Sequence, residues 1–260
     1  MPADNTLLTL TDLTVTATLP DGSAKELISG ISLQMQAGRA LAVVGESGSG
    51  KTTLARTVAG LLPSSLSVSG SQSSLGSVGY MFQDAGNALN PLRRSIWQVE
   101  EALRAQGVPR ADRREQALSY LARAEVPDVC RYARRYPHQL SGGLAQRVLL
   151  AAVLAGNPSI LIADEPTSAL DVTTQARIAS LLRRLVVEER IAMMLITHDL
   201  SVAAQIADDI AVMYQGHLVE QGSVREVFFS PQHDYTKQLV AAVPQRTRQA
   251  TTNGANDGTH

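Results

Sequence analysis

Three short apolar runs along the chain each end in residues that can carry chemistry. They are ALAVV (40–44) before Gly45, SILIA (159–163) before Asp164 and Glu165, and IAMMLI (191–196) before Thr197, His198 and Asp199. Continuous rather than alternating hydrophobicity predicts strands buried on both faces, as in a parallel sheet flanked by helices. Because ligands bind such sheets at the carboxyl ends of the strands, the polar residues after these runs are candidates for one site.

Helical patterns fill the intervals between the apolar runs. The predicted helices span residues 52–61, 144–155 and 172–189. Residues 96–136 are rich in Arg, Ala and Leu and contain no strand-like run, which predicts a helical insertion.

The remaining segments follow other patterns. In residues 7–35 apolar and polar residues alternate more than in the three apolar runs, and Pro-Asp-Gly lies at 20–22. This pattern predicts antiparallel strands joined by a turn. Residues 64–77 are rich in serine and are predicted to form a loop, and residues 246–260 have almost no apolar content, which predicts disorder. The expected fold is therefore α/β, with a mostly parallel sheet, an N-terminal antiparallel part and a helical insertion.

Composition narrows the class of protein. The 260 residues are 44% hydrophobic and 18% charged with a net charge of −1, so nucleic acid is not an expected partner. Cys130 is the single cysteine, which excludes an intrachain disulfide and predicts a small buried side chain. No apolar run approaches the roughly 18 residues of a membrane span, and the first residues lack the basic start of a secretory signal. We expect a cytosolic chain whose membrane role comes through a partner.

The sequence GESGSGKT after the first apolar run fits the phosphate-loop pattern G-x-x-x-x-G-K-[ST] between a strand and a helix. Backbone N–H groups of such a loop turn inward around phosphate oxygens. Lys51 is expected to contact the β- and γ-phosphates, and Thr52 is expected to bind Mg²⁺. The candidate ATP-binding residues are Gly45, Glu46, Ser47, Gly48, Ser49, Gly50, Lys51, Thr52 and Thr53. The alternative is a chance Gly/Ser loop.

Carboxylates and a histidine end the other two apolar runs. Asp164 can hold Mg²⁺ through water, and Glu165 can polarise an attacking water. His198 can contact a γ-phosphate. Taken singly, the carboxylates also fit a solvated strand end, and the histidine also fits a structural role. Because these residues occur together with a phosphate loop, a catalytic role is favoured.

A second anion-binding pattern lies in LSGGLAQR (140–147). Ser141, Gly142 and Gly143 open a predicted helix, where unpaired N–H groups and the helix dipole attract anions. The phosphate loop is already a complete anion site, so two interpretations are open. Either the chain binds two anions by itself, or it binds one anion and contributes half of a second, shared site.

The ordered set of motifs resembles the ATP-binding subunits of ABC transporters, a branch of the P-loop NTPases. The set is the phosphate loop, YMFQD, LSGGLAQR, LIADEP, SALD (168–171) and THD (197–199). The resemblance implies one ABC ATPase domain over residues 1–245, with a helical signature subdomain at about 96–156 inserted in its core. It implies two ATPase chains paired head to tail, each ATP lying between one chain's phosphate loop and the other chain's Ser141–Gly143.

Residue roles also follow from this resemblance. Gln83 matches the glutamine that contacts Mg²⁺ and links to the membrane subunits, so the implied Mg²⁺ residues are Thr52, Gln83 and Asp164. The implied catalytic residues are Glu165, His198, Lys51 and Gln83. Asp171 is expected to contact the opposing chain.

Three segments look like the oligopeptide, dipeptide and nickel importers: GESGSGKT, QDAGNALNP and SPQHDYTKQLVAAVP, the last with Asp234 where Pro is usual. This branch implies a second ATPase subunit, homologous or identical, two transmembrane permease subunits and, indirectly, an extracytoplasmic solute-binding protein. The chain would then lie peripherally at the cytoplasmic face of the cell membrane. Trp97 either lines a groove for a permease helix or serves ordinary helix packing.

Two features depart from the family pattern, and two other functions stay open. Ala17 stands where an aromatic residue usually stacks on adenine, and residues 62–80 are shorter than the corresponding hairpin region. One alternative is a soluble ABC ATPase of DNA repair, translation or cluster assembly. The other is a weakly active partner ATPase, which Ala17 favours and the intact Glu165 and His198 oppose.

Overall fold

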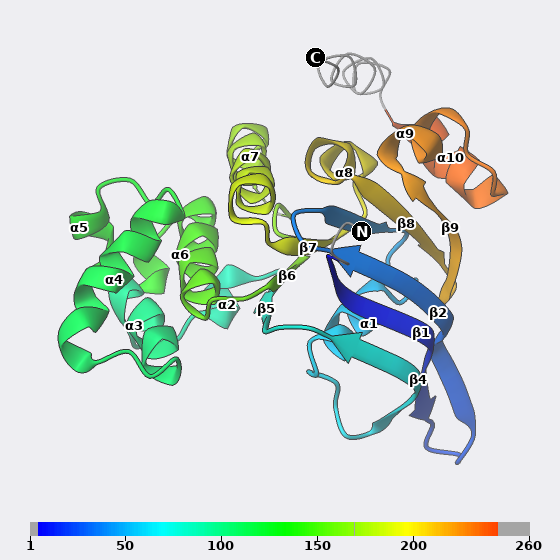
Figure 1. Ribbon diagram of the computed structural model, residues 1–260, viewed down its shortest axis with the longest axis horizontal. Coiled ribbons are helices and arrows are strands. Elements are labelled where there is room, and N and C mark those ends of the chain that lie inside the picture. Colours follow the sequence, from blue (N-terminus) through cyan, green and yellow to red (C-terminus); the bar gives the residue numbers. More distant parts are fainter. Residues whose placement is uncertain (1–4, 169, 244–260) are drawn as a thin grey trace.

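A computed structural model describes residues 5–168 and 170–243 of the chain. Its centre is a sheet in the order β5-β6-β7-β3-β8-β9, in which the first five strands are parallel and β9 pairs antiparallel with β8 (Figure 1). These strands are β5 (Val78–Met81), β6 (Ile160–Asp164), β7 (Ala192–Thr197), β3 (Ala40–Val44), β8 (Asp209–Tyr214) and β9 (His217–Ser223). The three apolar runs are therefore neighbouring strands, and the predicted parallel sheet is confirmed.

Side chains of these central strands divide between two hydrophobic cores. Leu41 and Val43 of β3 lie in one core with α1 (Lys51–Val58) and the antiparallel sheet. Ala40, Ala42 and Val44 lie in the other core, with the helices of the opposite face. The period-two alternation of a strand thus explains why the runs are apolar at every position.

A second, three-stranded antiparallel sheet has the order β2-β1-β4. β1 (Thr6–Thr18) and β2 (Ala24–Gln36) confirm the hairpin predicted for residues 7–35. The loop predicted for residues 64–77 is wrong, because β4 (Leu66–Ser74) pairs with β1. This edge strand is mostly exposed, so backbone hydrogen bonds to β1 hold it without the apolar alternation that marks a strand in sequence.

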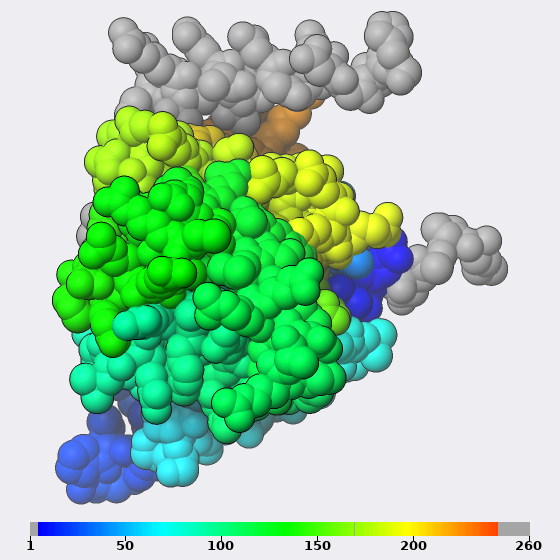
Figure 2. Space-filling view, turned by 90° about the vertical axis from the view of Figure 1, so that its left-hand side faces the viewer, coloured from blue at the N-terminus to red at the C-terminus, as the bar shows by residue number. Residues whose placement is uncertain are grey.

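Helices between β5 and β6 form a separate group at the left of Figure 1, and Figure 2 shows their outer face. They are α2 (Ala85–Ala88), α3 (Ser95–Ala105), α4 (Arg110–Arg123), α5 (Val129–Tyr132), the 3₁₀ turn η1 (Pro137–Gln139) and α6 (Gly142–Ala155). The helical character predicted for residues 96–136 is confirmed. Cys130 is exposed, however, so its predicted burial is wrong: it lies on α5, a single turn with no buried residue.

The C-terminal half supplies helices for one face and one edge of the sheet. They are α7 (Val172–Glu189), α8 (Leu200–Ile206), α9 (Val224–Phe229) and α10 (Asp234–Ala242). The bounds of α7 match the predicted helix, whereas α1 ends before residue 61. Residues 246–260, predicted to be disordered, lie outside the described residues. No helix in the described part of the chain is long and apolar enough to cross a membrane.

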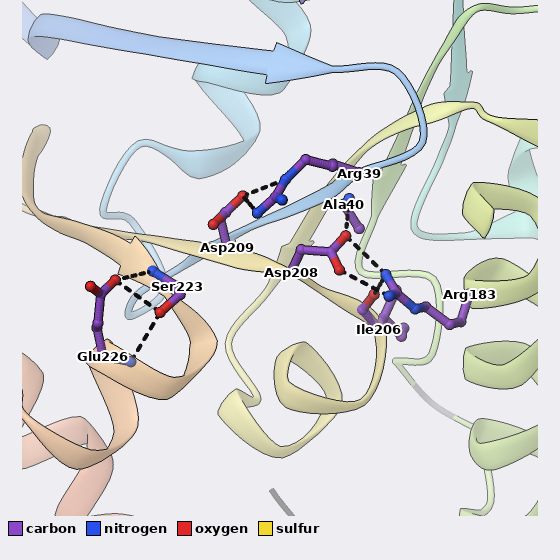
Figure 3. A network of polar contacts seen from close by, with 8 residues as sticks. All are labelled: Arg39, Ala40, Arg183, Ile206, Asp208, Asp209, Ser223 and Glu226. Carbon is purple, nitrogen blue, oxygen red and sulfur yellow. Dashed lines mark hydrogen bonds and ion pairs between the residues drawn. The ribbon is translucent and has the colours of Figure 1, made fainter. Parts of the chain in front are cut away.

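A polar network fastens the amino ends of β3 and β8 to α7 (Figure 3). The Asp208 carboxylate accepts the N–H of Ala40 at 2.9 Å and a bidentate pair of hydrogen bonds from Arg183, both at 2.9 Å. Arg39 and Asp209 form a second, more exposed ion pair beside it, at 2.8 Å. Bidentate arginine–carboxylate contacts fix orientation as well as distance, so Asp208 sets the position of β3 relative to α7.

Replacing Asp208 tests this fastening. Asp208→Ala leaves the Ala40 N–H and the Arg183 guanidinium without their acceptor, and we expect the free energy of unfolding to fall by about 1–3 kcal/mol. Asp209→Ala is the matched control, with an expected loss of about 1 kcal/mol or less because that pair is more exposed. Urea denaturation measures both losses, and equal losses would contradict a special role for Asp208.

Candidate functional site

A pocket of about 690 Å³ opens at the carboxyl edge of the parallel sheet. Its lining residues are Leu27, Gly45, Glu46, Ser47, Gly48, Gly50, Lys51, Thr52, Thr53, Gln83, Glu165, His198 and Leu239. Motifs that lie more than 100 residues apart in the chain therefore meet in one cavity. Because its walls include both apolar and charged groups, the pocket suits a ligand that has both kinds of surface.

The phosphate loop joins β3 to α1, and its last residue occupies a position that only glycine fits. Gly50, the N-cap of α1, has a φ of +101°, and a Cβ there would lie 2.6 Å from the side chain of Ile28. The loop also contacts the turn between β8 and β9, where Gly216 N–H donates to the carbonyl of Ser49 at 3.1 Å. The N-terminus of α1 and the loop amides thus form a rigid anion-binding concavity.

Lys51 is buried and its three donors are all used within the loop. Its Nζ donates to the carbonyls of Gly45 at 2.8 Å and Glu46 at 2.6 Å, and to Ser49 Oγ at 3.4 Å. Burial lowers the pKa of Lys51, although the nearby charges of Glu165, Asp164 and Glu46 oppose that shift. Partial desolvation strengthens the attraction of this ammonium for an anion.

Asp164 receives a hydrogen bond on each carboxylate oxygen. Thr52 Oγ1 donates to Oδ1 at 3.3 Å, and the Tyr80 hydroxyl donates to Oδ2 at 2.7 Å. Burial, with the bond to Asp164, raises the pKa of Tyr80, which keeps the hydroxyl protonated as a donor. The sequence did not single out Tyr80, because nothing about an aromatic residue in a strand signals a contact with a distant carboxylate.

The neighbourhood of Asp164 fits Mg²⁺. Asp164 is only 4% exposed, and its carboxylate faces the first helical turn after the phosphate loop through Thr52. Oxygen groups such as Asp164 and Thr52 are the ligands that this hard cation prefers. Among the described residues no group of three or more His, Cys, Asp or Glu could hold a metal ion. Mg²⁺ in proteins usually takes one or two carboxylates together with water and phosphate oxygens, and Asp164 beside the phosphate loop fits that pattern.

Glu165 is held from two sides. Gln83 Nε2 donates to Oε2 at 2.9 Å, and His198 Nδ1 lies 3.1 Å from Oε1. The backbone of Glu165 has a φ of +46°, and its N–H donates to the carbonyl of Ile196 in β7. Strain of this kind is found where a functional side chain must be aimed. The structure brings Gln83 to Glu165, and its predicted contact with Mg²⁺ remains a prediction.

The signature residues do not line this pocket. Ser141 is the exposed N-cap of α6, and its hydroxyl makes no capping hydrogen bond. Gly143 is buried against α7: a Cβ there would lie 2.4 Å from the Thr174 methyl group. Thr174 also donates to both oxygens of Asp171, and these bonds lower the pKa of that exposed carboxylate. Gly143 and Asp171 are thus linked through one threonine.

The sequence interpretation missed three residues around the pocket. Leu27 of β2 and Leu239 of α10 form apolar walls, and the Tyr235 hydroxyl accepts the N–H of Glu46 at 2.8 Å. Tyr235 also packs on Tyr214, with 4.3 Å between ring centroids. The segment HDYTKQLV contains two of them, but its pattern indicates a branch of the family rather than a pocket wall. Ala17 does not line the pocket and pairs with Lys25 and Leu66.

Comparison with known proteins agrees with these motifs. The model of the ABC transporter family matches residues 28–168. The oligopeptide transport ATP-binding protein AmiE of Streptococcus pneumoniae is 40% identical, over 93% of this chain and 73% of the relative. The dipeptide transport ATP-binding protein DppD of Bacillus subtilis is 38% identical, over 86% of this chain and 73% of the relative.

A solved structure has the same fold as this chain and a related sequence. It is a dimeric ATP-binding cassette in a post-hydrolysis state, bound to ADP and Pi. The match has a TM-score of 0.71 and 29% identity, and it covers 84% of this chain and 99% of the other. The predicted α/β ATPase fold is confirmed.

Alanine substitutions in the phosphate loop distinguish the cost of a steric clash from the cost of a strained backbone conformation. Gly48 has a φ of +84° but open space where a Cβ would lie, whereas a Cβ on Gly50 would clash with Ile28. We expect Gly48→Ala to cost about 1–2 kcal/mol and Gly50→Ala to cost more, with several degrees of further loss in Tm. Differential scanning calorimetry measures the difference. A Gly50→Ala protein as stable as Gly48→Ala would show that the packing against Ile28 is not limiting.

Proposed function

This chain belongs to the ABC transporter family, and we propose that it hydrolyses ATP to energise an importer of peptides. The observation that carries the proposal is the position of Glu165, held between Gln83 and His198 at the mouth of the phosphate loop. Two side chains from separate segments thus orient one carboxylate beside the phosphate loop. A carboxylate positioned in this way can act as the general base that activates a water molecule.

The phosphate loop is assigned to the triphosphate of ATP. Lys51 exchanges its loop carbonyls for oxygens of the β- and γ-phosphates, while the loop amides surround the β-phosphate. Thr52, Asp164 and Gln83 are the residues proposed to hold Mg²⁺. When bound, Mg²⁺ neutralises negative charge on the phosphate chain. The apolar walls of Leu27 and Leu239 suit the remainder of the nucleotide.

Hydrolysis then needs no covalent intermediate. Glu165 accepts a proton from the water that attacks the γ-phosphate, and Gln83 keeps one carboxylate oxygen oriented. His198 uses Nδ1 toward Glu165, which leaves Nε2 for the γ-phosphate. Positioning and charge stabilisation supply the rate enhancement.

A second ATPase chain is proposed to complete the site. Ser141 and Gly142 are exposed at the N-terminus of α6 and lie outside their own chain's pocket, which supports a role toward the partner's ATP. Asp171 is exposed, is linked to Gly143 through Thr174, and is proposed to contact the partner. The dimeric form of the matched cassette supports this arrangement.

Peptides are the proposed cargo of the importer. The relatives compared are named for oligopeptide and dipeptide transport, which favours peptides over the nickel-type substrates that the sequence also allowed. Two membrane permeases and an extracytoplasmic solute-binding protein are the proposed further partners, with the chain peripheral at the cytoplasmic face of the membrane. Trp97, whose ring lies 4.6 Å from the Arg93 guanidinium in a groove between α3 and α4, is a proposed permease contact.

Co-purification separates the importer from its rivals. We expect tagged chain to purify from membranes with permease subunits encoded beside it, and its ATPase rate to rise in that complex. Isolation as a self-sufficient soluble assembly favours the alternatives in DNA repair, translation or cluster assembly. A low rate that rises only with a second, different ATPase chain favours the weakly active partner.

Removing the carboxylate of Glu165 tests the catalytic assignment. Glu165→Gln keeps the size of the side chain and loses the proton acceptor, so kcat is expected to fall by about 10²–10⁴-fold. The Kd for ATP with Mg²⁺ is expected to stay within about threefold, because the phosphate loop is untouched. Steady-state ATPase assays and equilibrium binding measure the two effects, and Glu188→Gln on the exposed end of α7 is the control. Full turnover by Glu165→Gln would remove Glu165 from its role.

A bulky cation at Ser141 tests the shared site. Ser141→Arg is expected to leave ATP binding by the isolated chain unchanged and to reduce hydrolysis in the paired ATPase by at least about tenfold, since it crowds the partner's γ-phosphate. Ser119→Arg on the exposed face of α4 makes the same change elsewhere. Loss of ATP binding by isolated Ser141→Arg protein would place the signature in its own chain's site.

A further inference from the structure

Gln146, in the second turn of α6, is a buried polar residue that none of the assigned roles uses. The residue is 3% exposed, and its Nε2 donates to the backbone carbonyl of Gln83 at 3.0 Å. Its Oε1 is buried and has no hydrogen-bond partner in the described part of the chain. A buried amide with an orphaned oxygen costs free energy that an apolar side chain of the same size would not cost. Stability alone therefore does not account for a glutamine here.

The bond acts on an exposed segment that lies between the buried residues Met81 and Ala85. Gln83 is exposed, and so are its neighbours Phe82 and Asp84. Asp84 is held locally, because its carboxylate accepts the N–H of Asn87 as the N-cap of α2. The carbonyl of Gln83 is held by Gln146, and the side chain of Gln83 is held on Glu165 at 2.9 Å. Gln83 is thus pinned by its backbone to α6 and by its side chain to the carboxylate.

The position of Gln146 on α6 connects Gln83 to the N-terminus of that helix. The helix begins at Gly142 after the N-cap Ser141, so Gln146 lies little more than one turn from the residues proposed to meet the partner's ATP. A helix turn moves as a rigid unit, so a displacement of the N-terminus of α6 is carried to the carbonyl of Gln83. Gln83 then carries it to Glu165 in this chain's own pocket.

We propose that Gln146 is a positioning residue that holds Gln83 against Glu165, so that hydrolysis in the chain's own pocket depends on the position of α6. The inference rests on the proposed function, in which Glu165 activates the water. Gln146 touches neither nucleotide nor water; it acts through Gln83. Contact of α6 with the partner's nucleotide and hydrolysis of the chain's own nucleotide are coupled through the amide of Gln146.

Gln146→Met tests the proposal, since methionine matches the size of glutamine and lacks the donor. In the paired ATPase we expect kcat to fall by about 10- to 100-fold while the Kd for ATP changes by less than about twofold. The unfolding temperature is expected to stay equal or rise, because the orphaned oxygen is gone. Gln146→Leu is the second variant, for the case in which methionine packs poorly.

Gln72→Leu is the matched control. It removes another amide-to-carbonyl bond of 3.0 Å, from Gln72 to Val58 at the far end of α1, and is expected to leave kcat unchanged. In a Gln83→Ala background Gln146→Met is expected to have no further effect on kcat, because the link is already broken.

The outcomes are distinct. Unchanged kcat in folded Gln146→Met and Gln146→Leu proteins overturns the inference, as does an undiminished effect of Gln146→Met in the Gln83→Ala background. Full turnover by Glu165→Gln contradicts the proposed function instead. Lost turnover in Glu165→Gln, together with normal turnover in Gln146→Met, contradicts the positioning role alone.

Discussion

The parallel register of β6, β7 and β3 is the constraint on which the rest of the structure depends. Each strand is hydrogen-bonded to its neighbour in the same direction, so their carboxyl ends meet at one edge of the sheet. Gly45, Glu165 and His198 lie at or just after those ends and therefore share a pocket, although more than 100 residues separate Gly45 from Glu165 in the chain. The burial of all three strands on both faces keeps that edge in place, and the Asp208 network fixes the opposite edge.

Much of this arrangement could be predicted from the sequence, because it depends on patterns that are local. Continuous apolar runs identify the central strands, and glycine spacing identifies the phosphate loop. Contacts that depend on tertiary placement leave no such pattern. Tyr80 reads as one more aromatic residue of a strand until the fold sets it against Asp164, and β4 has no apolar alternation because it lies at an exposed edge. The prediction for Cys130 is wrong because cysteines are most often buried, whereas α5 is a single exposed turn.

The glycines of the signature segment illustrate how one residue type can serve two physical demands. Gly142 is exposed beside Ser141, where the absence of a side chain leaves the backbone N–H accessible. Gly143 is buried against Thr174, so a side chain there would push α6 away from α7. Since Thr174 also binds Asp171, the packing of α6 on α7 and the orientation of Asp171 are set together. Gly142 therefore leaves exposed surface for a partner, and the adjacent Gly143 allows close packing inside the chain.

The hydrogen bond from Glu46 to Tyr235 has a consequence for the synthesis of the protein. The two residues are 189 positions apart, so the phosphate loop leaves the ribosome long before the helix that completes its outer wall. At the usual pace of translation this interval is roughly 10–40 s. Throughout it the N–H of Glu46 has no tyrosine to meet, and the ring of Tyr214 lacks its aromatic neighbour. A nascent chain halted before α10 would hold an unfinished pocket, so the phosphate loop gains this outer wall only after residues 234–242 have emerged.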